Sequence, residues 1–136
     1  MSSALLLYHL VAMNTPRFKA VNPMLPARDV EKALRYYVER LGFRHTFGKV
    51  SNNYVGVARD GVELHLWWQR EEDFQSGKAG QAMLRFVVDD PDALFEEYKT
   101  KGLLSDGKCV EDKPWGTREF AFFDPNGNGL TFYRDL

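Results

Sequence analysis

One short stretch of the chain places an acid, an imidazole and an indole on the same side of a strand. Residues 62–68 alternate in character, so that Glu63, His65 and Trp67 face one way and apolar residues face the other. His65 has three interpretations: a hydrogen-bonded histidine on a half-buried face, a group that contacts a ligand, or a metal ligand. This combination of side chains suits a cleft wall better than plain solvent.

A second candidate lies in the loop of residues 114–116, where Trp115 offers a large flat surface that could cover a pocket or act as a structural plug. Two apolar runs, 120–123 and 130–133, follow it. They are separated by Asp-Pro-Asn-Gly-Asn-Gly, in which proline fixes φ and the Asn and Gly positions tolerate positive φ. The pattern predicts a β-hairpin that closes a ligand-binding cleft.

Arg85 is a further polar group that could join such a cleft. It shares a predicted strand face with Met83, where it could meet an anionic group, although pairing with Glu63 or Glu119 is an equal alternative. Cys109 is the only cysteine, which excludes an internal disulfide and a cysteine-rich zinc site. No base is evident beside it, so we interpret it as a bystander.

These side chains must be positioned by regular elements, and the first half of the chain predicts four strands and a helix. Residues 19–26 read as an edge or irregular strand, because their two prolines cannot donate to a ladder. Apolar residues recur at helical spacing from Val30 to Leu41, after a capping Asp29 and before Gly42. Three strands are expected after the helix, at 43–47, 53–58 and 62–68.

The second half repeats this order. After an exposed polar connection at 69–80, a strand is expected at 81–88. Asp90 then caps a helix with Pro91 at its first position, and Gly102 ends it. Strands are expected near 108–111, 118–123 and 130–134. The repeat predicts an α+β fold of two tandem βαβββ modules, about 20–70 and 81–136, forming a curved mixed sheet with a concave cleft and helices outside.

Composition narrows the function classes. The formal net charge is −1 with no block of like charge, so nothing points to nucleic acid. The apolar segment 4–12 is too short to span a membrane, and no Lys or Arg precedes it, which argues against a secretory signal. We interpret residues 1–19 as an N-terminal arm or leader, ordered only if it docks on this domain or a partner subunit, and residues 20–136 as a single cytoplasmic domain.

Three blocks of sequence resemble the glyoxalase/bleomycin resistance/dioxygenase (vicinal oxygen chelate) superfamily, and within it the antibiotic-binding bleomycin resistance proteins. They are residues 25–30 with 40–43, residues 54–60, and residues 114–121 with 124–128. The Asp-Pro-x-Gly-Asn turn is shared by the whole superfamily and therefore indicates the fold. The Trp-Gly-Thr-Arg-Glu-Phe block is more specific to the resistance proteins, although here it carries one extra residue.

The resemblance also implies where a metal would bind. Enzymes of the superfamily hold a divalent ion through one His, Glu or Gln on each of four strands. The matching positions in this chain are Asn22, His65, Met83 and Thr131. Only His65 is a competent ligand, so we expect no metal, no cofactor and no catalysis. The alternative is a metal-dependent lyase, transferase or dioxygenase of the same fold.

The resistance proteins imply a homodimer that sequesters a flat antibiotic without chemistry. Their N-terminal strand is exchanged between subunits, and Pro23 matches the proline associated with that exchange. Aromatic residues sandwich the planar bithiazole of a bleomycin-type drug in grooves at the dimer interface. With the cleft-facing residues of strand 62–68 added, the predicted ligand-binding residues are Phe47, Tyr54, His65, Trp67 and Trp115.

One departure from the relatives concerns charge. They carry several acids between the positions of Phe47 and Tyr54, which would attract a cationic drug, whereas residues 48–53 here are Gly-Lys-Val-Ser-Asn-Asn. Glu63, Glu119 or the acidic run at 71–73 could compensate. The sequence therefore does not name the ligand, and a domain that binds another protein and has no ligand groove is a third hypothesis.

Overall fold

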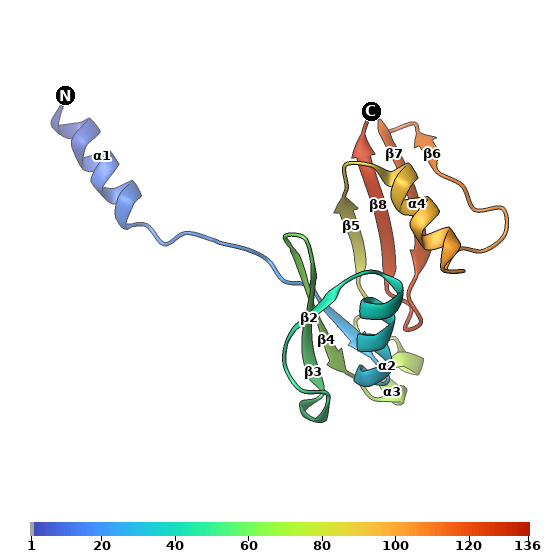
Figure 1. Ribbon diagram of the computed structural model, residues 1–136. Coiled ribbons are helices and arrows are strands. Elements are labelled where there is room, and N and C mark those ends of the chain that lie inside the picture. Colours follow the sequence, from blue (N-terminus) through green and yellow to red (C-terminus); the bar gives the residue numbers. More distant parts are fainter. Residues whose placement is uncertain (1) are drawn as a thin grey trace.

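Each half of the chain folds into a four-stranded mixed sheet with a helix against one face (Figure 1). The computed structural model describes residues 2–136, and for residues 8–13 it describes the backbone alone. The first sheet, in the order β1-β4-β3-β2, contains β1 (Met24–Ala27), β2 (Arg44–Phe47), β3 (Tyr54–Arg59) and β4 (Val62–Trp68). The second, in the order β5-β8-β7-β6, contains β5 (Met83–Val87), β6 (Glu111–Lys113), β7 (Thr117–Phe123) and β8 (Gly129–Asp135).

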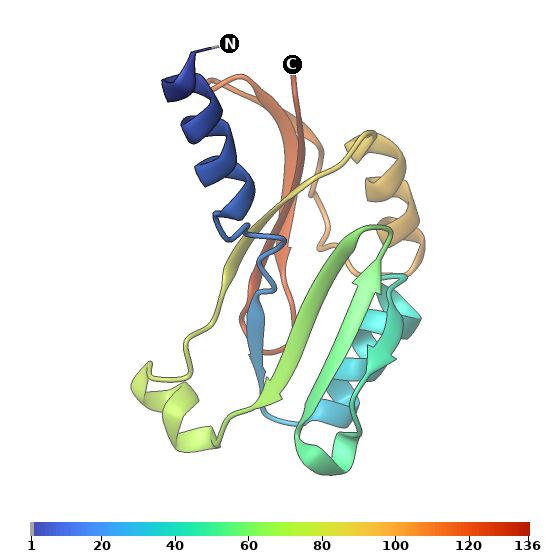
Figure 2. The ribbon, with the colours of Figure 1, turned by 90° about the vertical axis from the view of Figure 1, so that its left-hand side faces the viewer.

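The two sheets have the same internal arrangement. In each, the first strand pairs in parallel with the last, β1 with β4 and β5 with β8, and the other pairs are antiparallel. The helices α2 (Val30–Arg35) and α4 (Pro91–Thr100) lie on the same side of the molecule (Figures 1 and 2). The predicted α+β fold of two βαβββ modules is confirmed.

The helix boundaries follow the predicted caps. The Asp29 side chain accepts a hydrogen bond from the backbone of Lys32, and Asp90 accepts one from Ala93. After α2 the chain continues as a π-helical turn η1 (Tyr36–Arg40), and Gly42 then ends it at a φ of +80°. The predicted first helix is therefore present, in two segments.

One hydrophobic core joins the two modules. Leu25, Val55 and Leu66 from the first sheet are almost completely buried, in the same cluster as Phe120 and Phe132 from the second. Their burial uses one face of each sheet, as period-2 alternation requires. We call the opposite face, turned away from the helices, the open face of each sheet.

The predicted hairpin turn between β7 and β8 also connects the modules. The Asp124 carboxylate accepts hydrogen bonds from the Tyr37 hydroxyl (2.7 Å) and from the backbone N–H groups of Asn126 (2.8 Å) and Asn128 (3.0 Å). The Asn128 amide donates in turn to the Pro26 carbonyl of β1 (3.2 Å). Burial, followed by the Asp124 charge, raises the pKa of Tyr37 well above its ordinary value, so its hydroxyl remains a donor. Asp124 and Asn126 thus hold the predicted turn together.

Two stretches differ from the predicted elements. The connection at 69–80 contains a short helix, α3 (Glu71–Ser76), drawn in yellow-green in Figure 2. Its single apolar residue, Phe74, is 7% exposed beneath the Arg28 guanidinium, which lies 4.0 Å from the ring centroid. One apolar residue in a polar hexapeptide gives no periodicity from which to predict a helix. Strand β6 begins at Glu111 rather than near 108, because pairing with β7 and not an apolar pattern places this edge strand.

Strand β1 is shorter than predicted, and a 3₁₀ turn lies between β2 and β3. Only residues 24–27 of the predicted strand 19–26 pair in the sheet, directly after Pro23, which has no N–H to donate. Between β2 and β3 the chain makes a 3₁₀ turn, η2 (Val50–Asn52).

The N-terminal arm forms a helix, α1 (Ser3–Asn14), at the end of an extended segment. Figure 1 shows α1 standing away from both sheets, on the side opposite α2 and α4. Leu5, Leu6 and Leu7 are 52–64% exposed, so these side chains are not docked on the domain of the same chain. The His9 side chain lies outside the described part. Among the described residues, no helix is long and apolar enough to cross a bilayer.

Candidate functional site

Four of the five predicted ligand-binding residues lie together on the open face of the first sheet. The alternation predicted for β4 is present: Leu64 and Leu66 are buried in the core, and Glu63, His65 and Trp67 are half-buried on the other face. The ends of the apolar side, Val62 and Trp68, remain 41% and 45% exposed.

His65 is the centre of this group, which we call the aromatic cluster (Phe47, Tyr54, His65 and Trp67). Its ring lies edge-to-face with Phe47 (centroids 5.1 Å apart) and with Tyr54 (5.4 Å). Trp67 is the register partner of Tyr54 across the β3–β4 ladder, so it continues the same surface. The rings form one wall on the first sheet.

Hydrogen bonds use both nitrogens of His65. The Tyr54 hydroxyl lies 2.6 Å from Nδ1, and Glu63 Oε2 lies 3.4 Å from Nε2. A carboxylate can only accept, so Nε2 carries the hydrogen that faces Glu63, and with Nε2 as the donor, Nδ1 accepts from the Tyr54 hydroxyl. His65 is therefore a hydrogen-bonded, half-buried histidine, and its contact with a ligand stays a prediction.

Gly56 is a residue of this site that the sequence did not single out. A Cβ atom at Gly56 would overlap the Phe47 ring and lie 2.7 Å from Thr46 Oγ1. The glycine therefore lets the Phe47 ring lie flat across β3 and reach His65. A lone glycine inside a strand pattern often marks such a close approach, and this feature could have identified it.

Trp115 lies apart from the aromatic cluster, on the open side of the second sheet. Its ring is 63% exposed, and its Nε1 donates to Glu119 Oε2 at 3.4 Å. The same oxygen accepts from Arg85 Nη2 (2.9 Å) and from Thr117 Oγ1 (2.7 Å). Arg85 therefore pairs with Glu119 rather than Glu63. We call these four residues the Glu119 cluster: Arg85, Trp115, Thr117 and Glu119.

The Glu119 carboxylate is unusual for its low exposure. The residue is 7% exposed, and such an acid needs donors to remain charged. Burial raises the pKa of Glu119, but the three hydrogen bonds to its Oε2 outweigh burial and hold the pKa below its ordinary value. Glu119 was named from the sequence only as a possible partner of Arg85.

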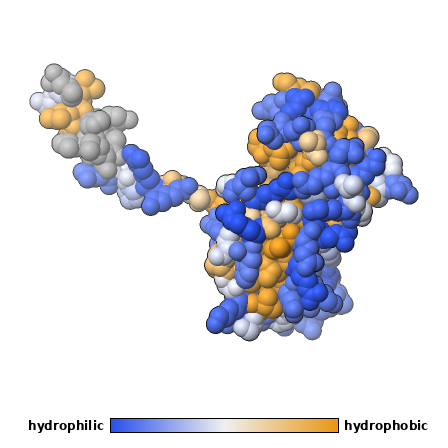
Figure 3. Space-filling view, in the orientation of Figure 1, coloured by the Kyte–Doolittle hydropathy of each residue, from blue (hydrophilic) through white to orange (hydrophobic). Residues whose placement is uncertain are grey.

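The open faces also expose large apolar side chains. On the second sheet, Met83 is 73%, Val87 71% and Phe123 66% exposed, and Trp115 in the loop before β7 is 63% exposed. On the first sheet, Phe47 is 43% and Met24 42% exposed. Figure 3 shows apolar surface gathered in the region of β5. Apolar surface of this extent commonly marks a ligand or subunit interface.

Of the four positions that match the superfamily's metal ligands, only His65 carries a side chain that commonly binds a divalent metal. Asn22 precedes β1 in the extended segment, and Thr131 lies opposite Arg85 and Ala121 in the second sheet. The Met83 side chain lies over Gly129, where a Cβ would be 2.5 Å from its sulfur. His65 has both nitrogens engaged. No three His, Cys, Asp or Glu residues of the described chain form a group able to hold a metal ion.

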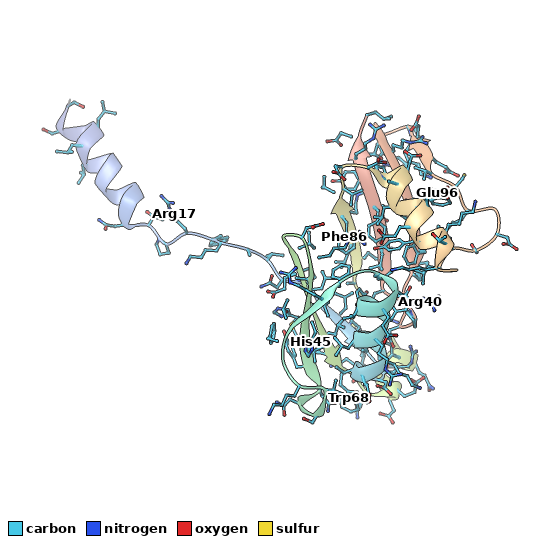
Figure 4. All side chains as sticks on the ribbon, in the orientation of Figure 1. Arg17, Arg40, His45, Trp68, Phe86 and Glu96 are labelled. Carbon is cyan, nitrogen blue, oxygen red and sulfur yellow. The ribbon has the colours of Figure 1, made fainter. Side chains whose placement is uncertain are left out.

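Residues outside these clusters have structural partners. His45 Nε2 contacts the backbone carbonyls of Phe47 (2.9 Å) and Gly48 (2.8 Å), on the strand side of the first module, opposite Arg40 on its helix side (Figure 4). Cys109 is exposed and contacts Glu111. A cavity of about 290 Å³ between the modules, lined by Phe43, Phe86 and Tyr98 among others, contains none of the predicted site residues.

Comparison with known proteins gives a consistent result. Residues 18–132 match the model of the Glyoxalase/Bleomycin resistance protein/Dioxygenase superfamily. A bleomycin resistance protein of Geobacillus stearothermophilus is 28% identical over 127 residues, covering 84% of this chain and 95% of that protein.

Solved structures extend the similarity. The bleomycin-binding protein of the bleomycin-producing Streptomyces verticillus, complexed with copper(II)-bleomycin, is 30% identical with a TM-score of 0.70, covering 90% of this chain and 100% of that one. A bleomycin-binding protein complexed with bleomycin is 24% identical with a TM-score of 0.71, covering 88% and 100%, and shares the fold.

Proposed function

Because the chain belongs to the glyoxalase/bleomycin resistance protein/dioxygenase superfamily, we propose that it sequesters a bleomycin-type glycopeptide antibiotic, or a similar planar ligand, without catalysis. The binding grooves would lie at the interface of a homodimer. The observation that carries this proposal is the aromatic cluster, which presents aromatic rings and one imidazole on a single open sheet face.

The cluster is suited to binding because its rings are fixed before a ligand arrives. The contacts of His65 with Tyr54 and Glu63 hold the imidazole, and the two neighbouring rings pack against it. A fixed wall loses little side-chain freedom when a planar group stacks on it. Each aromatic pair adds about 0.5–1.5 kcal/mol beyond the area buried, so two or three rings can anchor such a ligand.

Absence of catalysis is the second part of the proposal. At three of the four positions matching the superfamily's metal ligands, the chain has an amide, a thioether and a hydroxyl in place of imidazole or carboxylate. A thioether is a poor ligand for a hard divalent ion. Stoichiometric zinc, nickel, manganese or iron in freshly purified protein, measured by elemental analysis, would contradict this part.

A homodimer would complete the groove. The aromatic cluster lies on the first sheet and Trp115 on the second, and both open faces expose apolar side chains in a single chain. A second copy would bring its Trp115 over the first copy's cluster. Phe18 and Val21, at 103% and 86% exposure in the segment before Pro23, would be covered by exchange of this arm between subunits.

Calorimetric titration tests the assignment. Metal-free and copper-loaded bleomycin should each release or absorb heat with one ligand per groove, and should change tryptophan fluorescence. A Trp115→Ala variant should bind more weakly, and an Asp106→Ala variant, altered in an exposed loop, should bind normally. No heat and no fluorescence change at micromolar wild-type protein would refute the drug assignment.

A further inference from the structure

The Glu119 cluster spans three strands of the second sheet. Arg85 starts on β5 and must cross β8 to reach Glu119 on β7, since the strand order is β5-β8-β7-β6. It crosses over the Tyr133 ring, with its guanidinium carbon 4.3 Å from the ring centroid, and Tyr133 is itself the register partner of Glu119. The arginine is therefore held at both its stem and its tip.

One carboxylate oxygen, Glu119 Oε2, accepts all the hydrogen bonds that hold the cluster together. Glu119 Oε2 accepts from Arg85, Trp115 and Thr117, at distances of 2.9, 3.4 and 2.7 Å. The exposed indole donates a hydrogen bond to Glu119 and lies near the Lys113 ammonium (5.9 Å from the ring centroid), and these two contacts orient it. Removing the carboxylate would free the indole and the guanidinium together.

Two of the three carboxylates beside the proposed groove are paired with a cation. Glu119 pairs with Arg85 and Glu111 with Lys113 (2.7 Å), whereas Glu63 accepts hydrogen bonds from His65 and Thr46. Residues 48–53, between Phe47 and Tyr54, carry one lysine and no acid. The walls therefore offer flat rings and balanced charge, rather than a negative field.

We propose, resting on the function proposed above, that Glu119 is the positioning residue of the ligand site: it fixes the Trp115 indole for stacking and neutralises Arg85. The wall then recognises the planar, uncharged part of the ligand and not a cationic tail. Stacking and shape, with little contribution from net charge, set the affinity.

The test compares two metal-free bleomycin derivatives, one with a cationic terminal amine and one with an uncharged terminal amide. Wild-type protein should bind both with Kd values within about twofold, and these should change by less than about twofold between 50 and 300 mM NaCl, since little charge attraction is available to be screened. Glu119→Gln should weaken the uncharged derivative about tenfold, by loss of a charge-assisted hydrogen bond. It should weaken the cationic one further, because Arg85 is then unpaired.

A change in the ratio of the two Kd values separates positioning from general damage, since a misfolded site would lose both ligands equally. Glu119→Asp keeps the charge and should keep the wild-type ratio. Asp92→Asn, which removes a carboxylate paired with Arg118 on the helix side, should leave both Kd values unchanged. An unchanged ratio in Glu119→Gln, or a wild-type preference above tenfold for the cationic derivative, would overturn the proposal.

A ligand-free measurement keeps the positioning claim testable by itself. With 5-fluorotryptophan incorporated, the ¹⁹F resonance of Trp115, assigned with Trp115→Phe, should shift and narrow in Glu119→Gln as the indole gains freedom. The Trp67 and Trp68 resonances should stay in place. A Trp115 resonance unaffected by the substitution would refute positioning, whereas failure of wild-type protein to bind either derivative would refute the proposed function.

Discussion

At the scale of single residues, the aromatic cluster depends on a residue without a side chain. Gly56→Ala would place a methyl group where the Phe47 ring lies, so the ring must leave β3 and its contact with His65. We expect the free energy of unfolding to fall by about 1–3 kcal/mol, as in other overpacked sites. Urea denaturation measures this loss, and calorimetry should show weaker binding of bleomycin.

The chain provides a matched control. A Cβ at Gly61, in the β3–β4 turn, would meet nothing within 4 Å, and this glycine is not among those with positive φ. Gly61→Ala should therefore change stability by no more than about 0.5 kcal/mol in either direction. Equal effects of the two substitutions would show that the close approach of Phe47 to β3 is unimportant.

The lowered pKa of Glu119 predicts that the affinity for bleomycin depends on pH. Its pKa in the folded protein lies below the ordinary value of 4.5, so the ionised form is favoured by folding. The contribution of Glu119 is therefore fully present above 4.5 and is lost as the pH falls through the lower, folded value. Affinity for bleomycin at fixed salt should decline in that acidic window.

The same titration with Glu119→Gln separates this group from other acids. The variant should bind more weakly at pH 7 and show no further step assigned to residue 119 on acidification. Circular dichroism at each pH establishes that both proteins remain folded. Parallel curves for the two proteins would assign the acid step to another carboxyl.

The residues of the aromatic cluster could be predicted from sequence because they depend on local rules. Period-2 alternation puts His65 and Trp67 on one face, and a tight β3–β4 turn fixes which residue of β3 lies opposite. Gly56 was missed as a site residue although its place inside a strand pattern offered a signal, because the Phe47 ring that requires it comes from β2. Glu119 was missed because its ion-pair partner, Arg85, comes from β5, and no local pattern encodes that contact.

At the scale of elements, the β7–β8 turn acts as the connector between modules. Asp124→Ala would leave the buried Tyr37 hydroxyl and the Asn128 groups without their acceptor. Each unsatisfied buried group costs about 1–3 kcal/mol, so we expect a loss of at least about 3 kcal/mol in the free energy of unfolding. Thermal and urea unfolding should both report it.

An aspartate outside this network gives the comparison. Asp106 is exposed in the loop before β6, and Asp106→Ala should stay within about 0.5 kcal/mol of the wild type. If Asp124→Ala were equally mild, the turn would not be what holds the modules together.

Elements with strong caps and periodicity were the predictable ones. Both main helices begin at the predicted aspartates, and β4 has its predicted bounds, since cap chemistry and alternation act within a few residues. The short helix α3 and the edge strand β6 follow instead from tertiary contacts, the burial of Phe74 and the pairing of Glu111 with Glu119. Such elements have little pattern of their own.

At the scale of the whole molecule, neither the sequence nor a single chain determines what covers the open faces. The cavity between the modules belongs to one chain, but the aromatic cluster and Trp115 lie on different sheets. A groove built from both would need the two surfaces to face each other, and a symmetric pair of chains provides that twice. The division into an arm of residues 1–19 and a domain of 20–136 stays a prediction.

The dimer can be tested on the second sheet's open face. Met83 and Val87 are more than 70% exposed in the single chain, so Met83→Lys with Val87→Lys should leave the monomer's fold intact. If a second copy buries these two side chains, each lysine substitution removes about 1.5–3 kcal/mol of the free energy of association. The dimer dissociation constant should then rise at least about hundredfold. Analytical ultracentrifugation measures this, and bleomycin binding should fall in parallel because each groove needs both copies. The control is Thr100→Lys, at the exposed end of α4, which should stay dimeric. A wild-type protein that is monomeric and still binds bleomycin would instead place the whole groove within one chain.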